Sequence, residues 1–302
     1  MAGPSIASET DSLKVNRIWS GAIAESLFTV LFPSDCRICG TPLTRISRLP
    51  VCQKCLDAMQ STAEDVCRLC GERLFLSYAL DPSGESRCGL CRRAEPNFAR
   101  AVAYGSYESG LRELIHLLKY GGVRPAANVL GRMLAEAIST LEPQLSGPVV
   151  VVPVPLHRSK FRQREFNQAE LIARAAMKIR RSQDRLRLCA GALVRKRETA
   201  SQIGLTRHQR RANLRGAFAV AQPEVVKGNE VLVVDDVFTT GATASECTRV
   251  LLRAGATRVW VATVARTLKI SDQHLEIAGP DSDEIESSIE PEDVPMAKAV
   301  GI

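Results

Sequence analysis

Residues 231–243 read Val-Leu-Val-Val-Asp-Asp-Val-Phe-Thr-Thr-Gly-Ala-Thr. The first four residues, 231–234, are apolar and predict a strand that is buried on both faces, as in a parallel sheet. Two carboxylates, Asp235 and Asp236, follow at its carboxyl end, and a loop of small and hydroxyl-bearing residues comes next. Apolar residues at helical spacing then predict a helix over 244–254. The stretch therefore predicts an α/β protein whose ligand binds beyond the carboxyl ends of its strands.

The loop after the two acids has the chemistry of a phosphate site. Hydroxyl groups and backbone N–H groups ahead of a helix bind phosphate with the help of the helix dipole, and Gly241 lets the backbone come close. Adjacent carboxylates can accept hydrogen bonds from two vicinal sugar hydroxyls or face a hydrated Mg²⁺. Together these groups suit a ribose 5-phosphate. The alternative, a buried strand that ends in a solvated turn, explains the valines but neither the acids nor the threonines.

Size and charge limit the classes of protein that the sequence can encode. A chain of 302 residues allows one or two domains with a sizeable core. The net charge of +7 combines −8 on residues 270–302 with +15 on the rest of the chain, a balance that favours phosphate-bearing ligands or nucleic acid over mere solubility charge. No apolar run approaches about 20 residues, so we expect no membrane span. The start of the chain lacks a secretory pattern, which predicts a cytoplasmic protein.

Eight of the ten cysteines form four Cys-x-x-Cys pairs. Each pair brings two thiolates to one metal at about 2.3 Å, and two pairs complete a tetrahedral site. Metal ligation is favoured over disulfides without a secretory signal, and four copies argue against redox dithiols. Sequential pairing is the simplest arrangement, and a cross-braced one stays open. We expect two structural Zn²⁺ ions held by Cys36, Cys39, Cys52, Cys55, Cys67, Cys70, Cys88 and Cys91.

The remaining patterns divide the chain into four predicted parts. Residues 1–34 comprise a disordered start and an amphipathic helix, and residues 35–95 form a double zinc-ribbon module. Residues 96–268 carry the α/β domain, with strands expected over 98–107, 149–154 and 259–264 and helices over 111–118, 125–138 and 169–179. Residues 269–302 are acidic and poor in aromatics, so a disordered tail is expected there.

Two basic segments of the α/β part could bind an anion. The strand over 149–154 opens into a predicted loop, residues 155–168, where His157 could act as an acid, a base, a phosphate donor or a structural hydrogen-bonding group. Residues 192–218 predict a short strand, a basic polar segment and a helix. That segment is either a mobile loop that closes over a bound anion or a solvated basic helix.

These motifs carry a family resemblance. Residues 231–243 resemble the ribose-phosphate loop of type I phosphoribosyltransferases, and residues 15–266 together resemble the bacterial ComF family of competence-type phosphoribosyltransferases. One departure is Glu165, where many members have Gly, which changes the local charge and loop shape. The other motifs that carry the resemblance are Pro153-Val-Pro155-Leu-His157, Phe166-Asn167-Gln168, Arg195-Lys-Arg-x-Thr199-x-x-Gln202 and Arg211-x-Asn213.

The resemblance implies a type I phosphoribosyltransferase fold behind the zinc module, with 5-phosphoribosyl 1-diphosphate and Mg²⁺ as ligands. It implies that Asp235 and Asp236 bind the ribose hydroxyls, directly or through hydrated Mg²⁺, and that Arg195 and Lys196 bind pyrophosphate. Further candidates on the pyrophosphate side are Pro155, Leu156, His157 and Arg158. The 5-phosphate loop would consist of Val237, Phe238, Thr239, Thr240, Gly241, Ala242 and Thr243.

The acceptor of the ribose phosphate is not specified by the sequence. A nucleobase is one candidate acceptor, with Tyr104, Tyr107 and Tyr120 either stacking on it or belonging to the core. Two other classes of function stay open. One is a ribosyl-phosphate sensor without catalysis, and the other is a DNA-handling factor that binds single-stranded DNA or proteins of DNA uptake and repair.

Overall fold

The structure, a computed structural model, describes residues 34–43, 47–61, 66–74, 84–180, 185–199 and 206–268. The amphipathic helix and the acidic tail that the sequence predicts lie outside these residues. None of the helices in the described part is long and apolar enough to cross a membrane.

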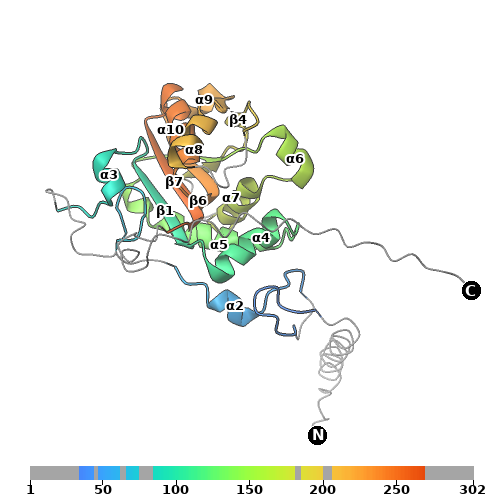
Figure 1. Cartoon of the computed structure of the whole chain (residues 1–302). Helices are drawn as coiled ribbons and strands as arrows, with labels where there is room; N and C mark the ends of the chain where they lie inside the picture. Colours follow the sequence, from blue (N-terminus) through green and yellow to red (C-terminus); the bar gives the residue numbers. More distant parts are fainter. Residues whose placement is uncertain are drawn as a thin grey trace, which may run out of the picture. The chain divides into compact units, whose positions relative to one another are not determined.

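A five-stranded parallel sheet organises the α/β part (Figure 1). Its central strands read as unbroken apolar runs because helices cover both of their faces. The predicted class, a mostly parallel sheet flanked by helices, is confirmed. In spatial order the strands are β1 (Arg100–Ser106), β7 (Arg258–Arg266), β6 (Glu230–Phe238), β2 (Val149–Pro153) and β3 (Leu186–Leu188).

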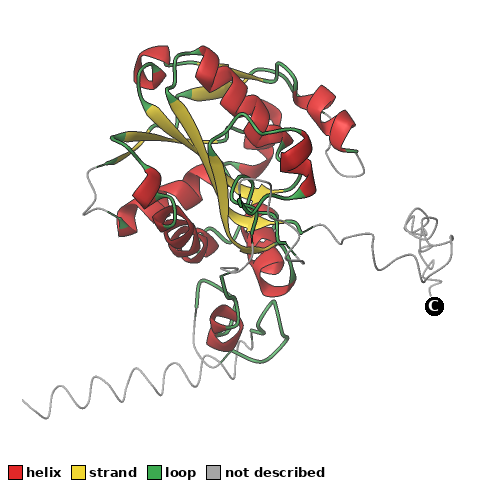
Figure 2. Ribbon diagram, turned by 90° about the vertical axis from the view of Figure 1, so that its left-hand side faces the viewer, coloured by secondary structure: helices red, strands yellow, loops and turns green. Residues whose placement is uncertain are grey.

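The helices divide between two apolar cores, one on each face of the sheet (Figure 2). Along β6 the pleat sends Leu232 and Val234 into the first core and Val231 and Val233 into the second. The first core contains α4 (Ser109–Lys119), α5 (Ala126–Ser139) and α7 (Gln168–Ile179). The second contains α8 (Arg207–Leu214), α9 (Pro223–Val226) and α10 (Ala242–Arg253).

Two details differ from the sequence prediction. The strand after residue 230 does not end before the acids, because β6 continues through both of them to Phe238. The predicted loop at 155–168 contains a helix, α6 (Arg158–Arg164), which ends at Glu165 in the left-handed conformation with φ 62°. Glycine usually adopts this conformation at helix ends, so Glu165 keeps the backbone shape that glycine would provide. The charged segment helps to form α6 because Arg, Lys and Gln are good helix formers.

The basic segment at 192–218 has the elements that the sequence predicts. Two short strands, β4 (Leu193–Arg195) and β5 (Phe218–Val220), pair antiparallel and lie before and after α8 in the sequence. A capping box between Thr206 and Gln209 begins this helix, since each side chain satisfies a backbone N–H group of the other.

The cysteine-rich part packs one ribbon on each core. Cys36 and Val51 of the first ribbon belong to the first core, whereas Cys67 and Leu69 of the second belong to the second core. The first ribbon contains the helix α2 (Gln53–Asp57), and the second contains α3 (Gly89–Arg93). Outside the ribbons, a 3₁₀ turn at Glu142–Gln144 precedes β2. Gly40 and Gly71, which follow Cys39 and Cys70, have φ values of 70° and 69°, a conformation that glycine adopts without strain.

Gly131→Ala should lower the free energy of unfolding by about 1–3 kcal/mol through overpacking. A Cβ atom at residue 131 of α5 would lie 2.4 Å from the Cβ of Ala175 and 2.9 Å from the backbone N of Ala176 in α7. The helix-propensity gain of about 1 kcal/mol cannot offset the clash, because the backbone of α7 cannot rotate away. Urea denaturation measures the difference. Gly147→Ala is the control, since nothing lies within 4 Å of its added Cβ, and an unchanged or more stable Gly131→Ala protein would contradict the predicted packing.

Candidate functional site

Residues 239–241 join β6 to α10, and together with the first two residues of that helix they form the segment called the loop at 239–243 below. Gly241 is the N-cap residue and has φ 75°, a conformation that other residues rarely adopt. A Cβ there would also lie 2.6 Å from Cζ of Phe238. The Oγ1 atom of Thr240 is buried and has no hydrogen-bond partner among the described residues. The loop therefore offers an unused hydroxyl and free helical N–H groups to an anion.

Asp235 lies beside this loop in a confined position. It lines a pocket together with Val154, Thr239, Thr243 and Thr263. Burial, and then the charge of Asp236, raise the pKa of Asp235 to about 7, although Lys119 and Arg195 oppose the rise. Asp235 is therefore about half protonated near neutral pH, and an approaching cation or hydrogen-bond donor would favour its ionised form.

Asp236 has a different partner although it is the next residue. Its carboxylate lies 2.9 Å from Nζ of Lys119, the last residue of α4. The Asp236 side chain is buried, and the Lys119 side chain is 15% exposed. Burial by itself would lower the pKa of Lys119, but the charge of Asp236 raises it. Lys119 therefore keeps its charge, and the position of the pair depends on the end of α4. Sequence reasoning missed Lys119, whose only signal was its place at the end of a predicted helix.

The three candidate tyrosines occupy different environments. The hydroxyl of Tyr104 donates to the carbonyl of Met59 at 2.7 Å, which is a structural contact with the first ribbon. Tyr107 is half-buried, and its hydroxyl lies 2.8 Å from Nε2 of His116. Tyr120 is 68% exposed, packs edge-on against His116 and lies under the guanidinium of Arg164 at 5.2 Å. Only Tyr120 thus presents a large aromatic surface to solvent.

The segment at 155–158, which follows β2, meets the segment that follows β4. His157 caps α6, and its Nδ1 atom accepts from the N–H of Ser159. The hydroxyl of Ser159 donates to Glu198 at 2.5 Å, and Nδ1 of His157 lies 3.8 Å from the same carboxylate. Pro155 and Leu156 are half-buried, and Arg158 is exposed. The structure therefore joins the two predicted pyrophosphate segments through Glu198, and the His157 contacts described here are structural.

Arg195 and Lys196 are adjacent but face different surroundings. The Arg195 guanidinium lies over the ring of Phe218 at 5.4 Å and donates to the hydroxyl of Thr199. Its charge opposes the rise in the pKa of Asp235. Its Nε atom is buried without a partner among the described residues. The Lys196 side chain is exposed. Arg195 therefore belongs to the surroundings of Asp235, whereas the described contacts do not bring Lys196 there.

A second residue that sequence reasoning missed is Arg210 of α8. Its Nη1 atom donates to the Thr239 hydroxyl at 3.2 Å. A cation thus lies directly against the loop at 239–243. The signal available in the sequence was only the basic character of the helix.

The eight paired cysteines gather into two groups of four, and the pairing is sequential. The first group is Cys36, Cys39, Cys52 and Cys55, and the second is Cys67, Cys70, Cys88 and Cys91. The sulfur atoms of Cys39 and Cys52 lie 3.7 Å apart, and those of Cys70 and Cys88 lie 3.6 Å apart. A tetrahedron of thiolates with Zn–S bonds of 2.3 Å has edges of about 3.8 Å, so both groups fit Zn²⁺. All four positions are thiolates, which makes the sites structural.

Comparison with known proteins gives independent information. Residues 27–93 match the double zinc ribbon domain family. The chain is 33% identical over 240 residues to the DNA utilization protein YhgH of Escherichia coli K12, with 78% of this chain and 98% of the relative covered. It is 31% identical over 228 residues to competence protein F of Haemophilus influenzae, with coverages of 73% and 92%.

Solved structures with partial similarity include two phosphoribosyl enzymes. The glutamine phosphoribosylpyrophosphate amidotransferase of B. subtilis is 23% identical, with a TM-score of 0.30, over 47% of this chain and 26% of that one. A hypoxanthine phosphoribosyltransferase of Staphylococcus aureus is 13% identical, with a TM-score of 0.27, over 49% and 70% of the two chains.

Asp235→Asn and Asp236→Asn should change the free energy of unfolding in opposite directions at pH 8. Asp235 holds a proton in the folded state up to a pKa of about 7, whereas the unfolded chain releases it near 3.8. The wild-type protein therefore loses stability as the pH rises from about 4 to 7, and Asp235→Asn removes that loss. Asp236→Asn leaves the Lys119 charge buried without its counter-charge, at a cost of about 3 kcal/mol.

Urea unfolding of the zinc-loaded proteins at pH 6 and pH 8 provides the measurement. Glu224→Gln, at an exposed position of α9, is the control and should change stability by less than about 0.5 kcal/mol. If Asp235→Asn destabilises the protein at pH 8 as strongly as Asp236→Asn does, the assigned environments are wrong.

Proposed function

This chain belongs to the family of competence protein F and DNA utilization protein YhgH, and from that premise we propose that it is a phosphoribosyltransferase. In this proposal it has the type I fold and binds 5-phosphoribosyl 1-diphosphate with Mg²⁺. The observation that carries the proposal is the loop at 239–243. Its unpartnered Thr240 hydroxyl and the N-terminus of α10 follow directly after two carboxylates in a strand.

Each part of the ligand has a matching group in the protein. The 5-phosphate accepts hydrogen bonds from the loop amides, the threonine hydroxyls and Arg210, which already contacts Thr239. The ribose hydroxyls donate to Asp235 and Asp236. Pyrophosphate lies toward Arg195, whose buried Nε atom has no described partner, and toward the segment at 155–158. Lys196 joins this side when its segment closes over the ligand.

Asp235 is the residue that fits Mg²⁺ best. Its raised pKa shows that burial disfavours the carboxylate, and a nearby cation would reverse that preference. Asp236 is already paired with Lys119 and serves as a fixed hydrogen-bond acceptor. When bound, hydrated Mg²⁺ neutralises charge on the pyrophosphate.

The reaction in this proposal breaks the C1–O bond to pyrophosphate, and the electron pair leaves with the pyrophosphate. An acceptor nitrogen forms the new bond to C1 and loses its proton. The protein lowers the barrier by holding the acceptor in line and by stabilising the leaving charge near Arg195. A planar nucleobase is the acceptor class that the exposed ring of Tyr120 would fit by stacking.

Isothermal titration with 5-phosphoribosyl 1-diphosphate, with and without Mg²⁺, tests the binding. Mg²⁺ should tighten wild-type binding, and the double variant Asp235→Asn with Asp236→Asn should lose it. Arg210→Gln should weaken it about tenfold, because a hydrogen bond between charged groups is lost. Arg132→Gln, on an exposed position of α5, should have no effect. Unchanged affinity in a folded, zinc-loaded double variant would disprove the proposed site.

Pyrophosphate release in the presence of candidate nucleobases then distinguishes an enzyme from a sensor. Release above the background without acceptor indicates transfer, whereas tight binding without release indicates a ribosyl-phosphate sensor.

A second candidate function, binding of single-stranded DNA, has support from α6. This helix exposes Phe161, which is 47% exposed, between the exposed cations Lys160 and Arg162. The pairing of Arg164 with Tyr120 continues the alternation of aromatic and basic groups. Unpaired bases stack on aromatic rings while neighbouring cations contact the phosphates. The names of the family members also connect them with DNA use and competence.

Phe161→Ala should weaken the binding of a single-stranded oligonucleotide by about 1–3 kcal/mol, because one stacked base is lost. The dependence of log K on log salt should keep its slope, since no charge changes, whereas Lys160→Gln should reduce that slope by about one. Fluorescence anisotropy at several salt concentrations measures both effects. Ile179→Ala, at another exposed apolar residue, is the control. Equal affinities of the wild-type and Phe161→Ala proteins would rule out stacking on α6.

A further inference from the structure

A buried arginine at the end of β7 contacts the second zinc-binding group. Arg266 is 5% exposed, and its Nη1 atom donates to the carbonyl oxygen of Cys70 at 2.5 Å. Its Nη2 atom lies 3.6 Å from Sγ of Cys70 and 2.7 Å from the carboxylate of Glu72, which is also buried. One guanidinium thus contacts the turn after Cys67 at three points, which are the Cys70 carbonyl, the Cys70 sulfur and the Glu72 carboxylate.

The same guanidinium also contacts the residue that supports the loop at 239–243. It lies over the ring of Phe238 at 4.6 Å, and Phe98 packs against that ring edge-on at 6.0 Å. The ring fills the space where a side chain on Gly241 would lie. The N–H of Thr267, the residue after Arg266, donates to the Phe238 carbonyl at 3.0 Å. The position of Phe238 therefore depends on Arg266 and its immediate neighbour.

We propose that Arg266 is a positioning residue through which the second zinc site fixes the loop at 239–243 for the 5-phosphate. A Zn²⁺ ion with four thiolates carries a net charge of −2, and together with Glu72 it holds the guanidinium of Arg266 in place. The guanidinium then holds the Phe238 ring against Gly241. The role in ligand binding rests on the proposed function, whereas the coupling of zinc to the loop does not.

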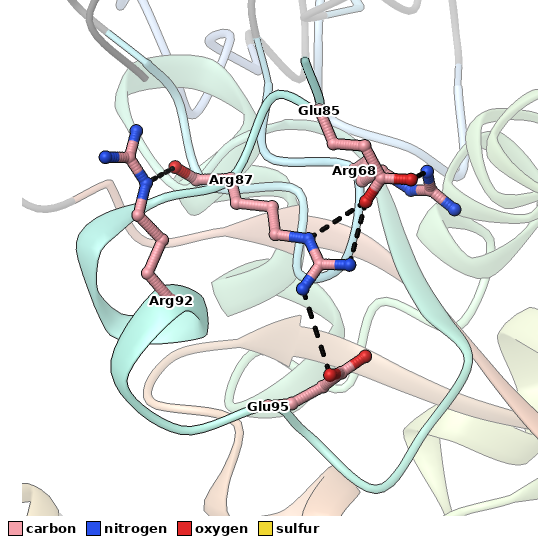
Figure 3. A network of polar contacts seen from close by, with 5 residues as sticks. All are labelled: Arg68, Glu85, Arg87, Arg92 and Glu95. Atoms are coloured by element: carbon pink, nitrogen blue, oxygen red, sulfur yellow. Dashed lines mark hydrogen bonds and ion pairs between the residues drawn. The ribbon is translucent and has the colours of Figure 1, made fainter. Parts of the chain in front are cut away.

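A separate network of polar contacts, which does not include Arg266, also stabilises the second ribbon (Figure 3). Glu85 pairs with Arg68 and accepts two hydrogen bonds from Arg87, at 3.0 and 2.8 Å. Nε of Arg92 in α3 donates to the carbonyl of Arg87 at 3.1 Å. These contacts tie together the segments that carry Cys67 and Cys70 and those that carry Cys88 and Cys91.

The first zinc group has no comparable described route to the loop. Its ribbon contacts the opposite core through Cys36 and Val51, and strand β1 through the hydrogen bond from Tyr104 to the Met59 carbonyl. The two zinc sites should therefore differ in what they control. Loss of the second should disturb the loop at 239–243, and loss of the first should leave it unchanged.

Arg266→Met and Arg266→Lys test the proposal, with Arg258→Met as the matched control. Arg258 lies at the other end of β7 and covers the ring of Trp260 at 5.6 Å, so it offers a similar contact far from the loop. We expect Arg266→Met to weaken ribose 5-phosphate binding about tenfold while pyrophosphate binding changes less than twofold. Arg266→Lys should restore part of the loss, because it keeps the charge but not the paired donors.

Two further measurements do not depend on the ribosyl ligand. Hydrogen exchange of the amides at 239–243 should accelerate in Arg266→Met, and a chelator should remove one of the two zinc ions faster than from wild type. Normal exchange and normal zinc retention in Arg266→Met would overturn the coupling. Equal weakening of ribose 5-phosphate and pyrophosphate binding would overturn the positioning role in favour of general destabilisation. A wild-type protein that binds no ribosyl ligand but shows the exchange and zinc effects would refute the proposed function alone.

Discussion

The enclosure of two adjacent carboxylates near the end of β6, with Asp236 buried and Asp235 half-buried, is the constraint on which the site depends. An ionised carboxylate away from water needs a counter-charge or must keep its proton. The chain uses both solutions. Lys119 pairs with Asp236 at 2.9 Å, and the pKa of Asp235 is raised to about 7, so that this carboxyl keeps its proton at lower pH. Two residues of one chemical type thus acquire different properties, because the pleat of a strand directs neighbouring side chains to different surroundings.

The packing of the zinc ribbons makes them part of the α/β structure and not an independent appendage. Each ribbon is too small to build a core of its own and adds apolar residues to one of the two cores beside the sheet. Beside the second ribbon, Arg266 contacts both the Cys70 carbonyl and the Phe238 ring, and that ring packs against Gly241. The loop that follows the acids therefore rests on side chains of the sheet and of the ribbon as well as on its own backbone.

Much of this organisation could be predicted from the sequence because it depends on local patterns. Unbroken valine runs predicted the buried strands, and the spacing of the cysteines predicted the two groups of four thiols. The residues that were missed, Lys119, Arg210 and Arg266, act through partners far away in the sequence. Hydrophobic periodicity shows which face of an element is buried, but it does not show which side chains meet where two elements end. The helix α6 was missed for a related reason, since a charged segment without an apolar stripe has no periodic signal.

The raised pKa of Asp235 connects the stability of the folded protein with the proposed function. A carboxyl group with a raised pKa lowers the stability of the folded protein at neutral pH, and the protein would be more stable with a neutral residue there. Thr240 and Arg195 repeat this pattern with buried polar atoms that lack described partners. These three unfavourable features lie on one strand end and the segments around it, whereas Asp236, the neighbouring carboxylate, forms an ion pair with Lys119. A ligand with a cation, hydroxyl groups and anionic oxygens would satisfy all three at once, so under the proposed function the groups that disfavour folding would favour binding.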